Sequence, residues 1–223
     1  MRKLVGICVV SVSLWMIAPC SAGVIVASGA GPTLATAEDL TGLYPSEIVG
    51  TLSGTNQNDV SVFKIFDRDS TDFSALTVLS AAFGIPDTVL SLFDASGIGV
   101  YLNDDISGAN TMSCLPSAGS GNPCPTSGAA LPVGFYYLAI SRSANYPIDA
   151  LGSEIFLPAS STALTGPSST NPVAGWDGGA FASANFDLIN YDIMLTGTVP
   201  EPATWLSIAG AGLVFGWLRR RRA

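Results

Sequence analysis

The 223-residue chain contains no histidine, and it contains no Gly-x-Ser-x-Gly sequence. Without histidine, neither a Ser-His-Asp nor a Cys-His catalytic arrangement is available, and zinc lacks one of its commonest ligands. The middle of the chain also lacks long apolar runs with a 3.6-residue period. These absences exclude the common hydrolase arrangements and argue against a helical domain.

Positive charge is scarce except at the two ends of the chain. Residues 23–198 hold sixteen acidic side chains but only three basic ones, Lys64, Arg68 and Arg142, which leaves a net charge of −13. So negative a surface repels phosphate backbones, and nucleic acid is therefore not expected as a partner. The charge suits divalent cations, cationic polymers or solubility outside the cell.

The N-terminal end has the three parts of a secretory signal peptide. A basic start is followed by an apolar stretch over residues 4–18 and by the small residues Cys20-Ser21-Ala22. We expect residues 1–22 to form a helical signal peptide that is removed on export. A lipoprotein site at Cys20 is the alternative, which Pro19 disfavours.

The C-terminal end has the physical properties of a membrane anchor. Residues 203–218 carry no charge, and as a helix they would span about 24 Å, slightly less than a bilayer core. Trp205 and Trp217 near the two ends suit the membrane interfaces, and the arginines that follow hold their end on the cytoplasmic side. On these properties alone, the tail is a transmembrane helix.

The order of the parts in this tail adds a more specific prediction. Pro200-Glu201-Pro202, a Gly/Ala/Leu-rich span and the cluster Arg219, Arg220, Arg221 and Arg222 together resemble the PEP-CTERM sorting signal of Gram-negative bacteria. The resemblance covers residues 199–223. It implies processing by a membrane-embedded exosortase, and therefore a membrane-anchored precursor that ends in the cell envelope or extracellular matrix. Gly212-x-x-x-Gly216 fits a helix-packing face, or simply the small-residue content of such tails.

Two cysteines remain after the signal peptide is removed. Cys114 and Cys124 flank nine residues rich in Gly, Pro and Ser. An exported chain meets an oxidising compartment, so we expect these cysteines to form a disulfide. A zinc site is the alternative, but it would need ligands that the chain does not supply.

The middle of the chain predicts an all-β domain over residues 23–198. Short runs rich in Val, Ile, Phe, Leu and Tyr are separated by turn residues. The expected strands are residues 60–66, 73–79, 88–93, 98–102, 135–140 and 187–196. The third and fourth form a hairpin around Asp94-Ala-Ser-Gly97. About eight strands indicate an antiparallel β-sandwich, with residues 157–179 as surface loops.

Three stretches of this domain resemble the bacterial pre-peptidase C-terminal (PPC) domains. They are residues 58–63, residues 87–97 followed by Asn103-Asp104-Asp105, and residues 131–139. The resemblance implies a jelly-roll-like sandwich of the kind found as an accessory module on secreted proteases. No protease domain accompanies it here.

The acidic residues near the predicted turns suggest a calcium site. Calcium takes about six to eight oxygen ligands, often from loops, and it occurs in some relatives of this fold. The candidate ligands are Asp59, Asp94, Asn103, Asp104 and Asp105. The simpler interpretation is that these residues are solvated turn residues, because no contiguous calcium-binding loop is present.

The sequence thus favours a non-enzymatic protein of the cell surface or extracellular matrix, with no cofactor unless calcium binds. One alternative is a calcium- or carbohydrate-binding module, in which aromatic side chains contact extracellular polysaccharide. Such side chains are more often core residues, and Trp176 is the one whose loop setting makes exposure plausible. The aromatic candidates are Tyr101, Tyr136, Tyr137, Tyr146, Trp176 and Tyr191. Another is a glycosidase using Asp104 with Asp105, or Asp67 with Asp69.

Overall fold

The computed structural model describes residues 22–52, 58–78, 87–115, 124, 128–158, 160–179 and 189–199. The signal peptide (apart from Ala22), the Pro-Glu-Pro sequence, residues 203–218 and the arginine cluster lie outside the described residues. Within the described ranges, no helix has the length and apolar character that crossing a membrane requires. The helical element described there is the short 3-10 helix η1, Leu34–Thr36.

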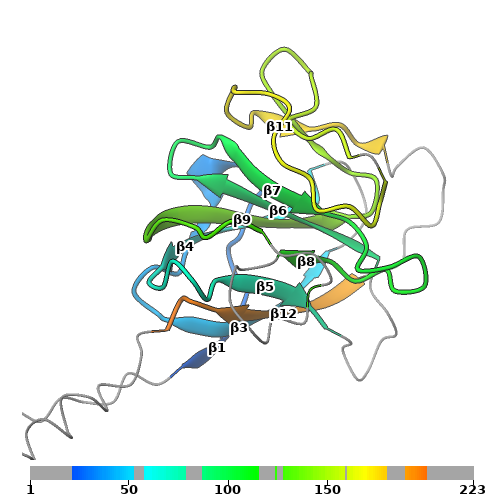
Figure 1. Cartoon of the computed structure of the whole chain (residues 1–223). Coiled ribbons are helices and arrows are strands. Elements are labelled where there is room, and N and C mark those ends of the chain that lie inside the picture. The colour runs from blue at the N-terminus through cyan, green and yellow to red at the C-terminus, as the bar shows by residue number, and fades with distance from the viewer. Residues whose placement is uncertain are drawn as a thin grey trace, which may run out of the picture. The chain divides into compact units, whose positions relative to one another are not determined.

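Two five-stranded sheets face each other, which confirms the predicted β-sandwich (Figure 1). Sheet A has the order β1-β3-β12-β5-β8, and sheet B has the order β2-β4-β9-β6-β7. The strands of sheet A are β1 (Gly23–Val26), β3 (Pro45–Leu52), β12 (Ile189–Thr196), β5 (Ser74–Thr77) and β8 (Cys114–Leu115). Those of sheet B are β2 (Glu38–Asp39), β4 (Ser61–Asp67), β9 (Gly134–Arg142), β6 (Thr88–Asp94) and β7 (Gly99–Asn103). A separate pair joins β10 (Pro147–Ile148) to β11 (Gly175–Trp176).

The sequence predicts a purely antiparallel sandwich, but both sheets also contain a parallel pair of strands. The strands β1 and β3 run parallel, and so do β2 and β4. The reason is the path of the chain, since these four strands belong alternately to sheet A and sheet B. Between two neighbouring strands of one sheet, the chain therefore passes through a strand of the opposite sheet. A connection of that length allows the two neighbours to run in the same direction.

The predicted hairpin is confirmed at β6 and β7, which pair antiparallel. A carboxylate oxygen of Asp94 accepts hydrogen bonds from the backbone N–H groups of Ser96 (2.8 Å) and Ile98 (3.0 Å). Gly97 completes the turn with φ +83°, a backbone angle that favours glycine. The same residue types that predicted the turn thus form it.

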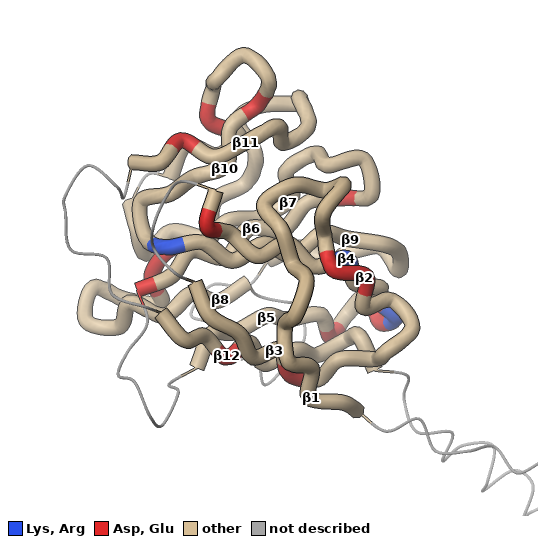
Figure 2. Tube along the Cα trace, turned by 180° about the vertical axis from the view of Figure 1, so that it is seen from behind, with Lys and Arg blue, Asp and Glu red and all other residues tan. Residues whose placement is uncertain are grey.

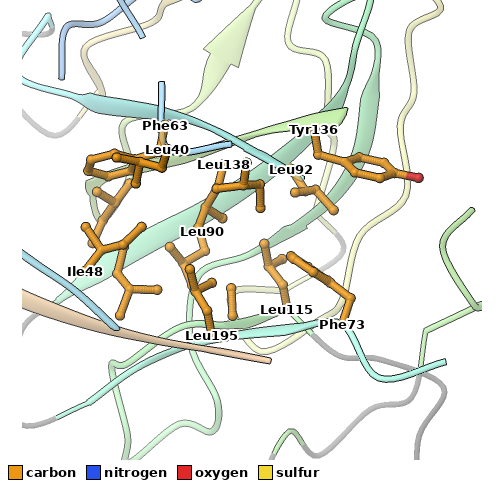
Figure 3. Packing of buried hydrophobic residues seen from close by; sticks show 14 of the residues in the cluster. Leu40, Ile48, Phe63, Phe73, Leu90, Leu92, Leu115, Tyr136, Leu138 and Leu195 are labelled. Carbon is orange, nitrogen blue, oxygen red and sulfur yellow. The ribbon is translucent and has the colours of Figure 1, made fainter. Parts of the chain in front are cut away.

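The main core fills the space between the two sheets (Figure 3). Leu90, Leu92 and Leu138 project from sheet B toward sheet A, where Ile48 and Leu195 meet them. All five side chains are buried. Burying each stabilises the fold by about 1.5–3 kcal/mol relative to solvent exposure.

A second core covers the other face of sheet B. Val89 and Phe93 of β6 pack there against Ile155, Phe156 and Trp176. Figure 1 shows the segment with β11 on the side of sheet B that faces away from β5, β12 and β3. Because sheet B is buried on both faces, the first six residues of β6 are all buried, and buried positions do not alternate with exposed ones.

The second core corrects one expectation about residues 157–179. The described part of this stretch is mostly surface loop, as predicted, but Trp176 was predicted as its exposed residue. Only 3% of Trp176 is exposed, and its indole N–H donates a 2.8 Å hydrogen bond to the Pro32 carbonyl oxygen. The stretch lacks apolar alternation because it covers a sheet instead of joining one.

The last strand, β12, lies in the centre of sheet A and pairs with both β3 and β5. Just beyond it, the Gly197 carbonyl oxygen accepts a 2.7 Å hydrogen bond from the backbone N–H of Arg68. The buried Thr198 hydroxyl donates to the Pro45 carbonyl oxygen. The folded structure is therefore fixed in place as far as Thr198.

Gly197 offers a direct test of this fixed end. Its φ is +77°, and a β-carbon there would lie 2.8 Å from the α-carbon of Phe73. We expect Gly197→Ala to lower the free energy of unfolding by about 2–4 kcal/mol, from backbone strain and crowding together. Gly152→Ala is the matched control, because Gly152 also has φ +77° but has nothing within 4 Å of the added carbon. Urea unfolding should show a loss of only about 1–2 kcal/mol for the control, and equal losses would contradict the described packing.

Asp67 makes the stability of the domain depend on pH. It is fully buried, and among the described residues its Oδ2 atom has no hydrogen-bond partner. Burial raises the pKa of Asp67 from 3.8 to about 6, although a hydrogen bond from the Asp69 backbone partly opposes this. The folded state therefore binds the proton more tightly, and the stability that Asp67 contributes falls as pH rises from about 4 to about 6.

We expect Asp67→Asn to reduce the loss of unfolding free energy between about pH 4.5 and pH 7.5, by an amount on the order of 1–3 kcal/mol. Urea unfolding at both pH values measures it. Asp72→Asn removes an exposed acid whose charge adds only slightly to the raised pKa of Asp67, so it should remove only a small part of the pH dependence. A pH dependence identical in the wild type and Asp67→Asn would show that Asp67 titrates normally.

Candidate cation site

Three aspartates meet at the open end of the β6–β7 hairpin. Asp87 directly precedes β6, and Asp104 and Asp105 directly follow β7. The register pairs Leu90 with Asn103, and its extension pairs residue 87 with residue 106, so Asp87 lies diagonally across from Asp105. One carboxylate oxygen from each aspartate lies within 4.8 Å of the others. Adjacent residues of a strand point to opposite faces, but the strand ends at Asn103, and Asp104 and Asp105 are free to converge.

Asp104 is the buried member of this cluster, with 3% of its surface exposed. Its Oδ2 atom accepts a 2.9 Å hydrogen bond from the Tyr146 hydroxyl. Its Oδ1 atom is buried and has no partner of hydrogen-bond geometry among the described residues. Burial raises the pKa of Asp104 to about 6; the Tyr146 hydrogen bond and, less strongly, the nearby Ser143 hydroxyl oppose the rise.

Asp87 and Asp105 connect this buried carboxylate to solvent. Asp87 is exposed and Asp105 partly so. Desolvation raises the pKa of Asp87, a hydrogen bond with Ser143 opposes the rise, and the charge of Asp105 adds to it. Arg142 lowers the pKa of Asp87 and so supplies some positive charge to the outer part of the cluster. The three carboxylates thus form an oxygen-rich, negatively charged group that is open on one side.

The structure brings together two of the five predicted calcium ligands, Asp104 and Asp105. The side-chain oxygen of Asn103 instead accepts a 2.8 Å hydrogen bond from the Cys114 backbone, and its amide donates to the carbonyl oxygens of Asp105 and Ala163. Asp94 caps the turn at the opposite end of the hairpin. Asp59 lies before β4 and is not among the three grouped aspartates.

Asp87 was not among the predicted ligands, although the sequence contains a signal for it. Once the turn at Asp94–Gly97 is recognised, counting outward along both strands places residue 87 close to residues 104 and 105. Figure 2 shows how far acidic positions outnumber basic ones along the described trace. With so many acids, composition alone does not indicate which of them come together.

The acid pairs considered for glycosidase chemistry are not arranged to reach a sugar. A glycosidase needs both carboxyl groups beside the scissile bond. Asp67 is completely buried and Asp104 almost so. The Oδ1 atom of Asp69 accepts hydrogen bonds from the backbone and hydroxyl of Thr71. Each pair therefore contains a carboxylate that a glycoside cannot contact in this structure.

The aromatic candidates do not form a common platform either. Tyr136, Trp176 and Tyr191 are buried, and they belong to different cores, since Trp176 packs in the second core and the two tyrosines pack between the sheets. The Tyr146 hydroxyl is used by Asp104. At least three of the six side chains are therefore not available to stack on a sugar in this structure.

In the structure, Cys114 and Cys124 are joined by a disulfide, with their α-carbons 5.5 Å apart. The bond would close a short ring, which restrains the unfolded chain by up to about 3 kcal/mol. We expect denatured, exported protein to show no free thiol in a colorimetric assay and to yield a linked peptide on non-reducing digestion. The Cys114→Ser, Cys124→Ser double variant is the control that carries neither thiol. Two reactive thiols in the exported wild-type protein would contradict the disulfide.

Comparison with known proteins found one family match, and the curated proteins that were searched gave none. The match is to the PEP-CTERM protein-sorting motif, over residues 198–222. It covers the predicted tail and begins at Thr198, the buried residue that ends the described sandwich. The chain therefore carries a PEP-CTERM sorting motif, which indicates exosortase-dependent sorting of an exported, envelope-associated protein of a Gram-negative bacterium.

Proposed function

We propose that this chain is a non-enzymatic structural or adhesive component of the cell surface or extracellular matrix, released from its membrane-anchored precursor by an exosortase. The observation that carries the proposal is the sorting motif at residues 198–222, which follows directly after β12. In this proposal the sandwich is the domain that is exported to its final location, and the tail is the sorting signal.

The junction between sandwich and tail supports this division. The last described contacts of the fold are the Gly197 and Thr198 hydrogen bonds. Val199 separates them from Pro200. Removal of the chain from the Pro-Glu-Pro sequence onward therefore leaves the two sheets and their hydrogen bonds intact. A folded domain therefore remains after the sorting signal is removed.

Several features support a role without catalysis. The sequence has no histidine, and the acid pairs that could hydrolyse a glycoside each contain a buried member, Asp67 or Asp104. The β6–β7 hairpin with its Asp94–Gly97 turn also fits the resemblance to PPC domains. We infer a jelly-roll-like domain of the accessory type.

Processing is tested by the mass of the C-terminal peptide from native cells, with and without their exosortase. We expect the wild-type protein to lose the arginine cluster only when the enzyme is present. Replacing Pro200, Glu201 and Pro202 by alanine should retain the cluster in both strains, because the recognised sequence is gone. Ser207→Ala, a conservative change within the tail, is the matched control and should be processed normally.

An intact arginine cluster in both strains for the wild-type protein would contradict the proposal. The chain would then be a membrane protein anchored by one C-terminal helix. Cleavage that persists without exosortase would also overturn it, since another protease would be responsible. Cell fractionation of the same samples shows where each product resides.

A further inference from the structure

We propose that Asp87, Asp104 and Asp105 bind one divalent cation of the calcium class at the open end of the β6–β7 hairpin. The site goes beyond the sorting function, and it differs from the set of ligands that the sequence predicted. It is built by two sequence segments, one entering β6 and one leaving β7.

The first argument is the spacing of the carboxylates. Three of their oxygens lie within 4.8 Å of one another. Like charges this close repel each other strongly, and burial of one of them weakens the screening by water. A cation placed between them converts this repulsion into attraction.

The second argument is the unpartnered oxygen of Asp104. This side chain is 3% exposed, and the Tyr146 hydroxyl occupies only its Oδ2 atom. The Oδ1 atom has no partner of hydrogen-bond geometry among the described residues, although the nearby Ser143 hydroxyl lowers the pKa of Asp104 slightly. A buried charged oxygen without a partner is costly, and the Tyr146 hydrogen bond holds the carboxylate in place with Oδ1 available as a ligand.

Arg142 alone does not account for the cluster. It lies opposite Thr88 in the β6–β9 register, and its charge acts on Asp87, the most exposed of the three. At the buried Asp104, the charges of Asp105 and Asp87 instead raise the pKa further. The innermost negative charge is therefore the one that a bound cation would neutralise.

The chemistry of the ligands selects the class of cation. The chain has no histidine, and the structure joins Cys114 and Cys124 in a disulfide, so the ligands here are oxygens. Calcium accepts six to eight oxygens in flexible geometry, whereas magnesium requires a near-octahedral set. Three carboxylates in short loops, completed by carbonyls or water, suit calcium better. Extracellular modules bind calcium with a Kd of about 10⁻⁴–10⁻³ M, and we expect that range.

The test uses the full exported protein, stripped with a chelator and titrated with calcium chloride in a calorimeter. We expect one site per chain. Thermal unfolding with calcium at about ten times the Kd should raise the melting temperature by about 3–6 °C over the chelated protein. Magnesium at the same concentration should have a smaller effect.

Three variants make the test specific. Asp87→Asn should weaken calcium binding by at least about tenfold, and it is expected to fold because Asp87 is exposed. Asp105→Asn should do the same. Asp72→Asn removes one negative charge from an exposed position outside the cluster and should bind calcium like the wild type.

The outcomes separate clearly. No heat of binding at about 10 mM calcium, together with an unchanged melting temperature, would overturn the proposal. Binding that Asp87→Asn and Asp105→Asn leave intact would overturn the assignment to these residues, and an equal loss in Asp72→Asn would indicate general attraction to a negative surface. None of these results bears on tail processing, which is measured separately in cells.

Discussion

The burial of sheet B on both faces is the constraint on which most of the structure depends. Its strand β6 is buried at six of its seven residues, so a single opposing sheet would leave half of its side chains in water. Sheet A covers one face, and the chain after β9 must return across the other. That return brings Ile155, Phe156 and Trp176 onto Phe93. It also brings Tyr146 to Asp104, so the layer that completes the core fixes the innermost carboxylate of the cation cluster.

Local patterns in the sequence predicted the strands with strong apolar signals, and they missed the parts whose burial depends on distant neighbours. The strands β4, β6, β7, β9 and β12 appear within a few residues of their expected positions. β3 was missed because Ser46, Glu47 and Gly50 interrupt it; a side chain at Gly50 would overlap the Tyr191 ring, so glycine is needed there. The parallel pairs were also missed, since chain crossings between sheets leave no local pattern.

For the acidic residues, residue type was a weaker guide than register. Aspartate and asparagine side chains can cap turns, form hydrogen bonds with backbone groups or bind cations equally well. Asp94 caps a turn and Asn103 holds three backbone groups, although both resembled ligands in the sequence. Asp87 belongs with Asp104 only through the pairing of β6 with β7. The tail was different, because its order of parts along the chain is itself the signal, and there the family match agrees with the prediction.

The position of β12 has a consequence for the order of folding. It is the central strand of sheet A, between β3 and β5, and it is the last strand that the structure describes. A chain exported from its N-terminus releases β3 and β5 before the strand that joins them, so Ile48 and its neighbours stay uncovered until Ile193 and Leu195 arrive. Closure of sheet A thus waits for the segment that immediately precedes the sorting motif. A chain that stalls or is cut short during export lacks the strand that closes sheet A, and a protease can distinguish it from a complete one.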